Sequence, residues 1–170
     1  MNVSQQVLRF TALILLSWVV MILTHEAGHI LGGWCSGGTL VDFDLIPWHL
    51  PYSLFAPDPL PLVTLWSGPI LGAAVPYAVA LYSRRESTQL VAYFCVLANG
   101  IYITVAWFAG DSELDTTKLL SHGAHPASIA AYCLVTVGVG YVGFRKCCVS
   151  CFQAKPSDEE APTVKSPKTS

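Results

Sequence analysis

The stretch that decides the fold is VLRFTALILLSWVVMIL at residues 7–23, which runs directly into THEAGH at residues 24–29. The first part is apolar over nearly the ~20 residues that cross a bilayer core. The second part is an H-E-x-x-H pattern formed by His25, Glu26 and His29. On a helix the two imidazoles lie on one face and can bind one cation, with Glu26 beside the open coordination position. The sequence therefore predicts a metal site at the end of a membrane-spanning helix.

A metal site accounts for these residues better than a pair of histidines that caps the span at the membrane surface. Ionisable groups in hydrocarbon cost about 2.5–3.5 kcal/mol each on insertion scales unless they find partners. Three such groups placed together imply a shared partner, and a simple cap has no use for Glu26. No A-x-A-like cleavage site follows the apolar stretch, so we expect this helix to be retained.

The composition is that of an integral membrane protein. Of the 170 residues, 53% are apolar and 12% are charged, about half the charged share of a soluble domain. Three further apolar runs, at residues 60–82, 90–110 and 126–144, are long enough to span a lipid bilayer. We therefore expect an all-α integral membrane protein with about four transmembrane helices in one domain, residues 1–152. The small net charge of −2, without a basic cluster, excludes a nucleic-acid-binding protein.

The basic residues predict the orientation of the spans. Those that flank the spans on one side are Arg9, Arg84, Arg85, Arg145 and Lys146. The connections on the other side contain one basic residue, Lys118. Because positive residues stay on the cytoplasmic side, both termini of this multi-pass protein should be cytoplasmic. The tail at 153–170, rich in Pro, Ser, Thr, Lys and Glu, should be disordered.

The same orientation brings His25 and His29 to the side of the segment GDSELDTTKLLSHGAHP at residues 110–126. A catalytic zinc ion usually has three protein ligands, so this acidic segment should provide the third. The candidates on this side are Asp111, Glu113, Asp115, His122 and His125, of which Asp115 and Asp111 are preferred. Ser112 and Asp115 also have the S-x-x-D spacing of a helix capping box, which would need no metal.

Three motifs together resemble the site-2 protease family of intramembrane zinc metalloproteases. They are HEAGH in the first apolar segment, Gly68-Pro69 in the second, and LDTTKLL at residues 114–120. The family's late motif is L-D-G-G-x-L-L or a close variant, and the resemblance covers residues 15–122. The chain departs from this family pattern in three ways. Thr116 and Thr117 stand in place of the two glycines, the N-x-x-P sequence that usually precedes the late motif is missing, and no polar residue follows Gly68-Pro69.

The resemblance implies that His25, His29 and Asp115 bind Zn²⁺ and that Glu26 is the general base. Its substrates would be transmembrane segments of other membrane proteins. The segment at 37–59 alternates apolar and polar residues from Leu40 to Ile46 and is rich in aromatics, which indicates a short strand pair, a re-entrant loop or an interfacial aromatic belt. The resemblance implies a hairpin there that offers a sheet edge to the substrate.

A second class of function remains open, a non-catalytic zinc-binding membrane scaffold or adaptor. The altered glycine positions favour it, and the intact Glu26 argues against it. A transporter is disfavoured, because its ionisable residues would follow a path through the bilayer.

The pairs Gly28/Gly32 and Gly68/Gly72 predict close helix packing, and the lone amide of Asn99 predicts a hydrogen bond between helices. Nothing in the sequence indicates an oligomeric state.

Overall fold

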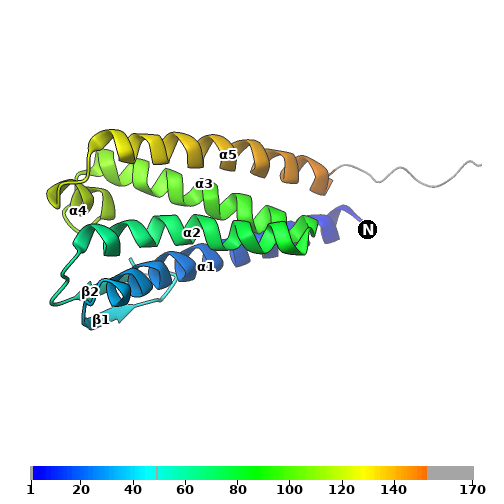
Figure 1. The fold of residues 1–170 in the computed structure, drawn as a ribbon. Coiled ribbons are helices and arrows are strands. Elements are labelled where there is room, and N and C mark those ends of the chain that lie inside the picture. The colour runs from blue at the N-terminus through cyan, green and yellow to red at the C-terminus, as the bar shows by residue number, and fades with distance from the viewer. Residues whose placement is uncertain (1, 49, 153–170) are drawn as a thin grey trace, which may run out of the picture.

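The computed structural model describes residues 2–48 and 50–152, which form five helices and one two-stranded sheet (Figure 1). The helices are α1 (Val3–Cys35), α2 (Pro61–Ser83), α3 (Glu86–Ala109), α4 (Asp115–Ser121) and α5 (Pro126–Phe152). The strands β1 (Leu40–Asp44) and β2 (Tyr52–Phe55) pair antiparallel. All helices but α4 are long and apolar enough to cross a membrane. The predictions of about four such helices and of a strand pair between the first two are confirmed. The tail at 153–170, predicted to be disordered, lies outside the described residues.

Helix α1 is longer than its apolar run predicts, because it continues through the H-E-x-x-H pattern to Cys35. Its second half packs directly on the backbone of α2. A Cβ atom added at Gly28 would lie 2.5 Å from the carbonyl oxygen of Ser67 and 2.9 Å from the Cα of Gly68. The predicted close packing of the two helices is therefore present, and it brings the two histidines against α2.

Helix α3 is the centre of the bundle and contacts α1, α2, α4 and α5. At one end, Ile103 of α3, Leu119 of α4 and Ile129 of α5 form a buried apolar cluster. The buried hydroxyl of Thr116 also donates a hydrogen bond of 2.7 Å to the carbonyl oxygen of Ile103. These contacts hold the short helix α4 against the bundle, where its first residue, Asp115, is buried.

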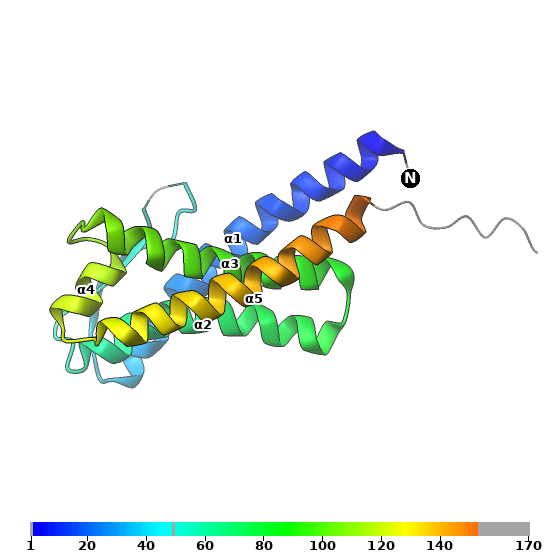
Figure 2. The same ribbon diagram turned by 90° about the horizontal axis from the view of Figure 1, so that it is seen from above.

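The ends of the helices divide into two groups (Figures 1 and 2). The start of α1, the α2–α3 turn and the end of α5 lie at one end of the bundle, where the rings of Phe10 and Phe152 are 5.2 Å apart. The hairpin and α4 lie at the other end. The same helix ends were assigned to one side of the membrane from the positions of the basic residues. That this side is the cytoplasmic one stays a prediction.

Cysteine labelling in intact cells should test this orientation. A cysteine at Ser87, in the first turn of α3, should react with a membrane-impermeant maleimide only after lysis, whereas a cysteine at Ser121 should react in intact cells. The background should keep the fully buried Cys95 and replace the other native cysteines. Reaction of both introduced cysteines from the same side would contradict the four-span arrangement.

Candidate metal centre

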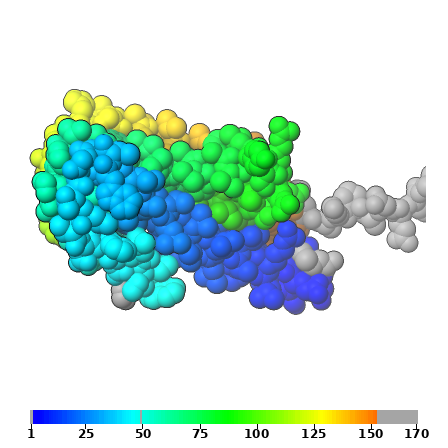
Figure 3. Space-filling view, turned by 60° about the horizontal axis from the view of Figure 1, so that its bottom comes forward, coloured from blue at the N-terminus to red at the C-terminus, as the bar shows by residue number. Residues whose placement is uncertain are grey.

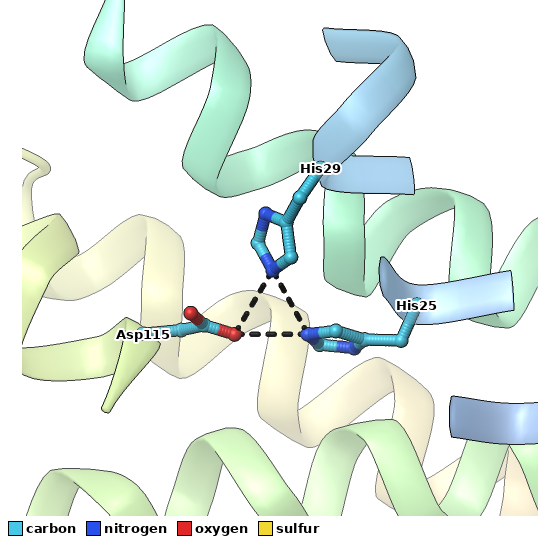
Figure 4. Close-up of side chains that lie close together, drawn as sticks. All are labelled: His25, His29 and Asp115. Carbon is cyan, nitrogen blue, oxygen red and sulfur yellow. Dashed lines mark hydrogen bonds and ion pairs between the residues drawn. The ribbon is translucent and has the colours of Figure 1, made fainter. Parts of the chain in front are cut away.

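Three potential metal ligands converge between α1 and α4 (Figure 4). The Nε2 atoms of His25 and His29 are 3.0 Å apart. The Oδ2 atom of Asp115 lies 2.9 Å from the former and 3.3 Å from the latter. All three residues are buried, and their side chains point toward one another from two elements that are distant in sequence. The three atoms form a small triangle, the arrangement expected of three ligands to one ion.

The other nitrogen of each imidazole is held by a hydrogen-bond acceptor. Asn99 Nδ2 donates to the carbonyl oxygen of Cys95 at 2.8 Å, which leaves Asn99 Oδ1 to accept from His25 Nδ1 at 2.6 Å. His29 Nδ1 donates to the carbonyl oxygen of Thr64 at 2.9 Å. With the proton on Nδ1 in both rings, each Nε2 carries a lone pair. Partners of this kind fix the tautomer and orientation of metal-binding histidines.

The three residues fit a divalent cation such as zinc. Two lone-pair nitrogens and one carboxylate oxygen repel one another when nothing positive lies among them. The ligands of a tetrahedral zinc ion, at ~2.0–2.2 Å from it, are about 3.3–3.6 Å apart, close to the sides of this triangle. Two imidazoles and a carboxylate also form a donor set that catalytic zinc sites use, with the fourth position left open.

Asp115 reaches the site as the first residue of α4. The residue that precedes the helix, Leu114, makes no side-chain capping bond, so the alternative of a capping box from Ser112 to Asp115 is wrong. Burial opposes ionisation of Asp115. When His29 is protonated rather than bound to a metal, its charge and the hydrogen bonds with both histidines outweigh that burial and hold the pKa of Asp115 well below its ordinary value. Asp115 is therefore available to the site as a carboxylate.

Asp111, the other candidate ligand, lies apart from this group. It is exposed in the turn after α3, and its Oδ1 accepts a hydrogen bond of 3.0 Å from the backbone N–H of Glu113. The metal-ligand group found among the described residues contains Asp115 and not Asp111. The structure thus places Asp111 in a turn-forming role and leaves Asp115 as the candidate third ligand.

Glu26 stands beside the triangle without belonging to it. Its side chain is buried, and its Oε2 accepts a hydrogen bond of 2.8 Å from the hydroxyl of Ser53 on β2. The Glu26 side chain makes no other hydrogen bond in the described part of the chain, so Oε1 is free to accept one from a substrate or a water molecule. The position next to the ligands is the one that a general base requires.

The hairpin forms one wall of a cleft of 590 Å³ over the site. The cleft is bordered by Glu26, His29, Asp115, Tyr102 and all four residues of β2. Within the described residues β2 pairs with β1 alone, so its second edge is free. Figure 3 shows the hairpin region, in cyan, lying along α1. A hydrogen bond of 3.0 Å from Trp18 Nε1 to the carbonyl oxygen of Pro47 ties this region to α1.

A smaller apolar hollow of 140 Å³ adjoins the same residues. It is lined by Trp18, Met21, Ile22, His25, Glu26, Leu50, Pro51 and Tyr102. The ring of Tyr102 packs edge-on against His25, with ring centroids 5.4 Å apart. Because Glu26 and Tyr102 border both hollows, a chain lying in the cleft could place one side chain in the apolar hollow.

Ser53, Tyr102 and the Thr64 carbonyl were not predicted as site groups, and no short motif marks any of them. Asn99 was predicted to bond between helices, and it does so with a histidine of the site. Comparison of the chain with protein-family models, curated proteins and solved structures found no match. The functional argument therefore rests on the geometry of the site.

The Gly68→Ala variant should weaken metal binding, because a Cβ atom at Gly68 would overlap the ring of His29. That ring cannot move away without losing its bond to Thr64 or its place beside Asp115. We expect an affinity loss of about 10- to 100-fold, as for other changes that misorient a ligand. Competition with a chromogenic chelator would measure it. In the control, Gly138→Ala, the added Cβ meets nothing within 4 Å, and an equal loss there would contradict the explanation.

Proposed function

We propose that this protein is an intramembrane zinc metalloprotease that hydrolyses peptide bonds in or near transmembrane segments of membrane proteins. The observation that carries the proposal is the convergence of His25 Nε2, His29 Nε2 and Asp115 Oδ2 beside a fourth polar side chain, Glu26, that is not a ligand. Structural zinc sites are closed by four protein ligands, whereas catalytic sites have three and a nearby base.

Zn²⁺ bound by these three residues would act as a Lewis acid that polarises the scissile carbonyl and lowers the pKa of a water molecule. Glu26 accepts the proton of the attacking water on Oε1 and later delivers it to the nitrogen of the leaving amine. Ser53 donates to Oε2 and so holds the carboxylate in one orientation. Asn99 and the Thr64 carbonyl hold the two imidazoles.

The substrate in this proposal is an extended segment, because the amide of an intact helix is shielded by its own hydrogen bonds and side chains. Strand β2 lines the cleft and has one edge without a partner strand among the described residues, and such an edge can pair with an extended chain by β-augmentation. The apolar hollow beside Glu26 suits one apolar side chain of a membrane segment. Substrates whose helices unwind easily near the membrane surface should therefore be preferred.

The Ser53→Ala variant tests the link between the hairpin and the base. Hydrogen bonds to charged groups contribute about 1.5–3 kcal/mol, so the cleavage rate should fall by roughly tenfold or more while zinc content stays unchanged. Ser53→Thr keeps the hydroxyl and should retain most of the activity. Equal rates for Ser53→Ala and wild type would show that the bond does not position Glu26.

A non-catalytic zinc-binding scaffold is the second candidate, because the same Ser53–Glu26 bond could serve only to attach the hairpin to α1. Purified zinc-loaded protein should be incubated with two kinds of single-span peptide. One kind has an uninterrupted poly-Leu span, and the other has an Asn-Pro or Gly-Gly pair within the span that destabilises its helix. The protease proposal expects cleavage of the destabilised peptides, little cleavage of a poly-Leu span, and inhibition by a zinc chelator. Stoichiometric zinc with no cleavage of any peptide would favour the scaffold.

A further inference from the structure

A hollow of 670 Å³ lies between α3 and α5, at the end of the bundle opposite the metal ligands. Helix α3 contributes Glu86, Gln89 and Tyr93 to its wall, and α5 contributes residues between Gly138 and Cys151. None of these residues belongs to the proposed active site. The volume is within the range of about 300–1,000 Å³ that is typical of small-molecule sites.

The hollow is apolar toward the middle of α5, here called its floor, and charged at the end of the bundle, here called its mouth. Gly138, Val139 and Val142 line the floor, and Glu86, the first residue of α3, and Lys146, near the end of α5, line the mouth. A Cβ atom at Gly138 would meet nothing within 4 Å, so the missing side chain leaves open space. From Gly138 to Lys146 the helix rises ~12 Å, close to the depth of one leaflet of the hydrocarbon core. These dimensions suit an acyl chain that enters from the membrane surface.

The two charged residues at the mouth have no partner within the described residues. Neither the Glu86 side chain nor the Lys146 side chain makes a hydrogen bond or an ion pair there, and both are exposed. Glu86 lines the same hollow as Lys146 and the residue next to it, Cys147. One negative and one positive charge are therefore available at the same opening.

A second hollow, of 440 Å³, adjoins the first. It lies between α2 and α3, shares Gln89 and Tyr93 with the first hollow, and includes Arg84. The two hollows thus run along either side of the first turns of α3, with a basic residue beside each. A ligand with two apolar chains and a phosphate fits this arrangement better than a single fatty acid.

We propose that this end of the bundle binds a glycerophospholipid with a phosphoethanolamine headgroup, its phosphate on Lys146 and its ammonium group on Glu86. The acyl chains occupy the hollows on either side of Tyr93. A primary ammonium can donate hydrogen bonds to the carboxylate of Glu86, whereas the quaternary ammonium of choline cannot. A glycerol headgroup has no positive charge for Glu86. Phosphoethanolamine is therefore the zwitterionic headgroup that satisfies both residues.

Native mass spectrometry of the full-length protein, in detergent with equal amounts of dioleoyl phosphatidylethanolamine, phosphatidylcholine and phosphatidylglycerol, tests this proposal. We expect one retained lipid per chain, with phosphatidylethanolamine preferred. Glu86→Gln should abolish the preference over phosphatidylglycerol. Lys146→Gln should lower the retention of all three lipids roughly two- to fivefold, as expected for loss of one exposed charge pair.

Gly138→Phe supplies a test that does not depend on charge. The Cβ atom of the new side chain would meet nothing within 4 Å, so the ring can extend into the hollow, and Phe has a higher helix propensity than Gly. Retention of phosphatidylethanolamine should fall by about tenfold or more. The matched control is Val135→Phe, at an exposed position of α5 outside the hollow, which should bind lipid as wild type does. Equal retention in both variants, or equal amounts of the three lipids on wild type, would overturn the proposal in favour of non-specific annular lipid.

Discussion

The Glu26→Gln variant is expected to fold and bind zinc as wild type does, and to lose cleavage activity by roughly 10²- to 10⁴-fold, the usual contribution of a general base. Glutamine has nearly the same shape as glutamate and can still accept the hydrogen bond from Ser53. It cannot take a proton from water. Because Glu26 is not one of the three converging ligands, the metal should remain. Cleavage rates and zinc content should be measured on the same preparation.

The matched control for this substitution is Glu113→Gln. Glu113 borders the same cleft, but its carboxylate is exposed, lies outside the ligand triangle and forms an ion pair of 3.5 Å with Lys118. Its replacement should change the cleavage rate by less than about twofold, since exposed ion pairs contribute little. Cleavage by Glu26→Gln within a few-fold of wild type would exclude the role of Glu26 as a base.

Replacement of a ligand should have the largest effect on metal content. His25→Ala, His29→Ala and Asp115→Asn should each reduce zinc from about one ion per chain toward zero after dialysis against a weak chelator. The physical reason is that each side chain directs a lone pair into the same small triangle. Asp115→Asn preserves shape but removes the charge that the two histidines face.

Asp111→Asn is the control for the choice of carboxylate. Its Oδ1 accepts a backbone hydrogen bond in a turn, and asparagine can do the same. Zinc content should therefore remain at the wild-type level. Loss of zinc from Asp111→Asn with retention in Asp115→Asn would reverse the assignment of the third ligand.

The histidine pair and Glu26 could be predicted because helix geometry alone places them. The end of α1 at Cys35 could not, because the apolar run stops at Leu23 and the polar residues of the motif follow. Those residues remain helical because groups from other elements satisfy them, among them Asn99 of α3 and Asp115 of α4. A hydropathy pattern contains no information about such partners.

The choice between Asp115 and Asp111 also depended on tertiary structure. Both are in the same acidic segment, and the decision follows from where α4 begins and how it is held. Thr116 stands where the L-D-G-G-x-L-L motif has a glycine. Its hydroxyl donates a hydrogen bond to the Ile103 carbonyl, which helps to fix α4 against α3. Ser53 could not be predicted at all, since its bond to Glu26 joins residues 27 positions apart without any motif.

X-ray absorption at the zinc edge on the purified wild-type protein tests the central claim most directly. The account predicts about one zinc ion per chain with roughly four nitrogen and oxygen neighbours at ~2.0–2.2 Å, and the outer-shell scattering of two imidazoles. The six cysteines of the chain are all free and offer the competing explanation. A sample without zinc, or one dominated by sulfur scattering at about 2.3 Å, would contradict a metal centre built from His25, His29 and Asp115.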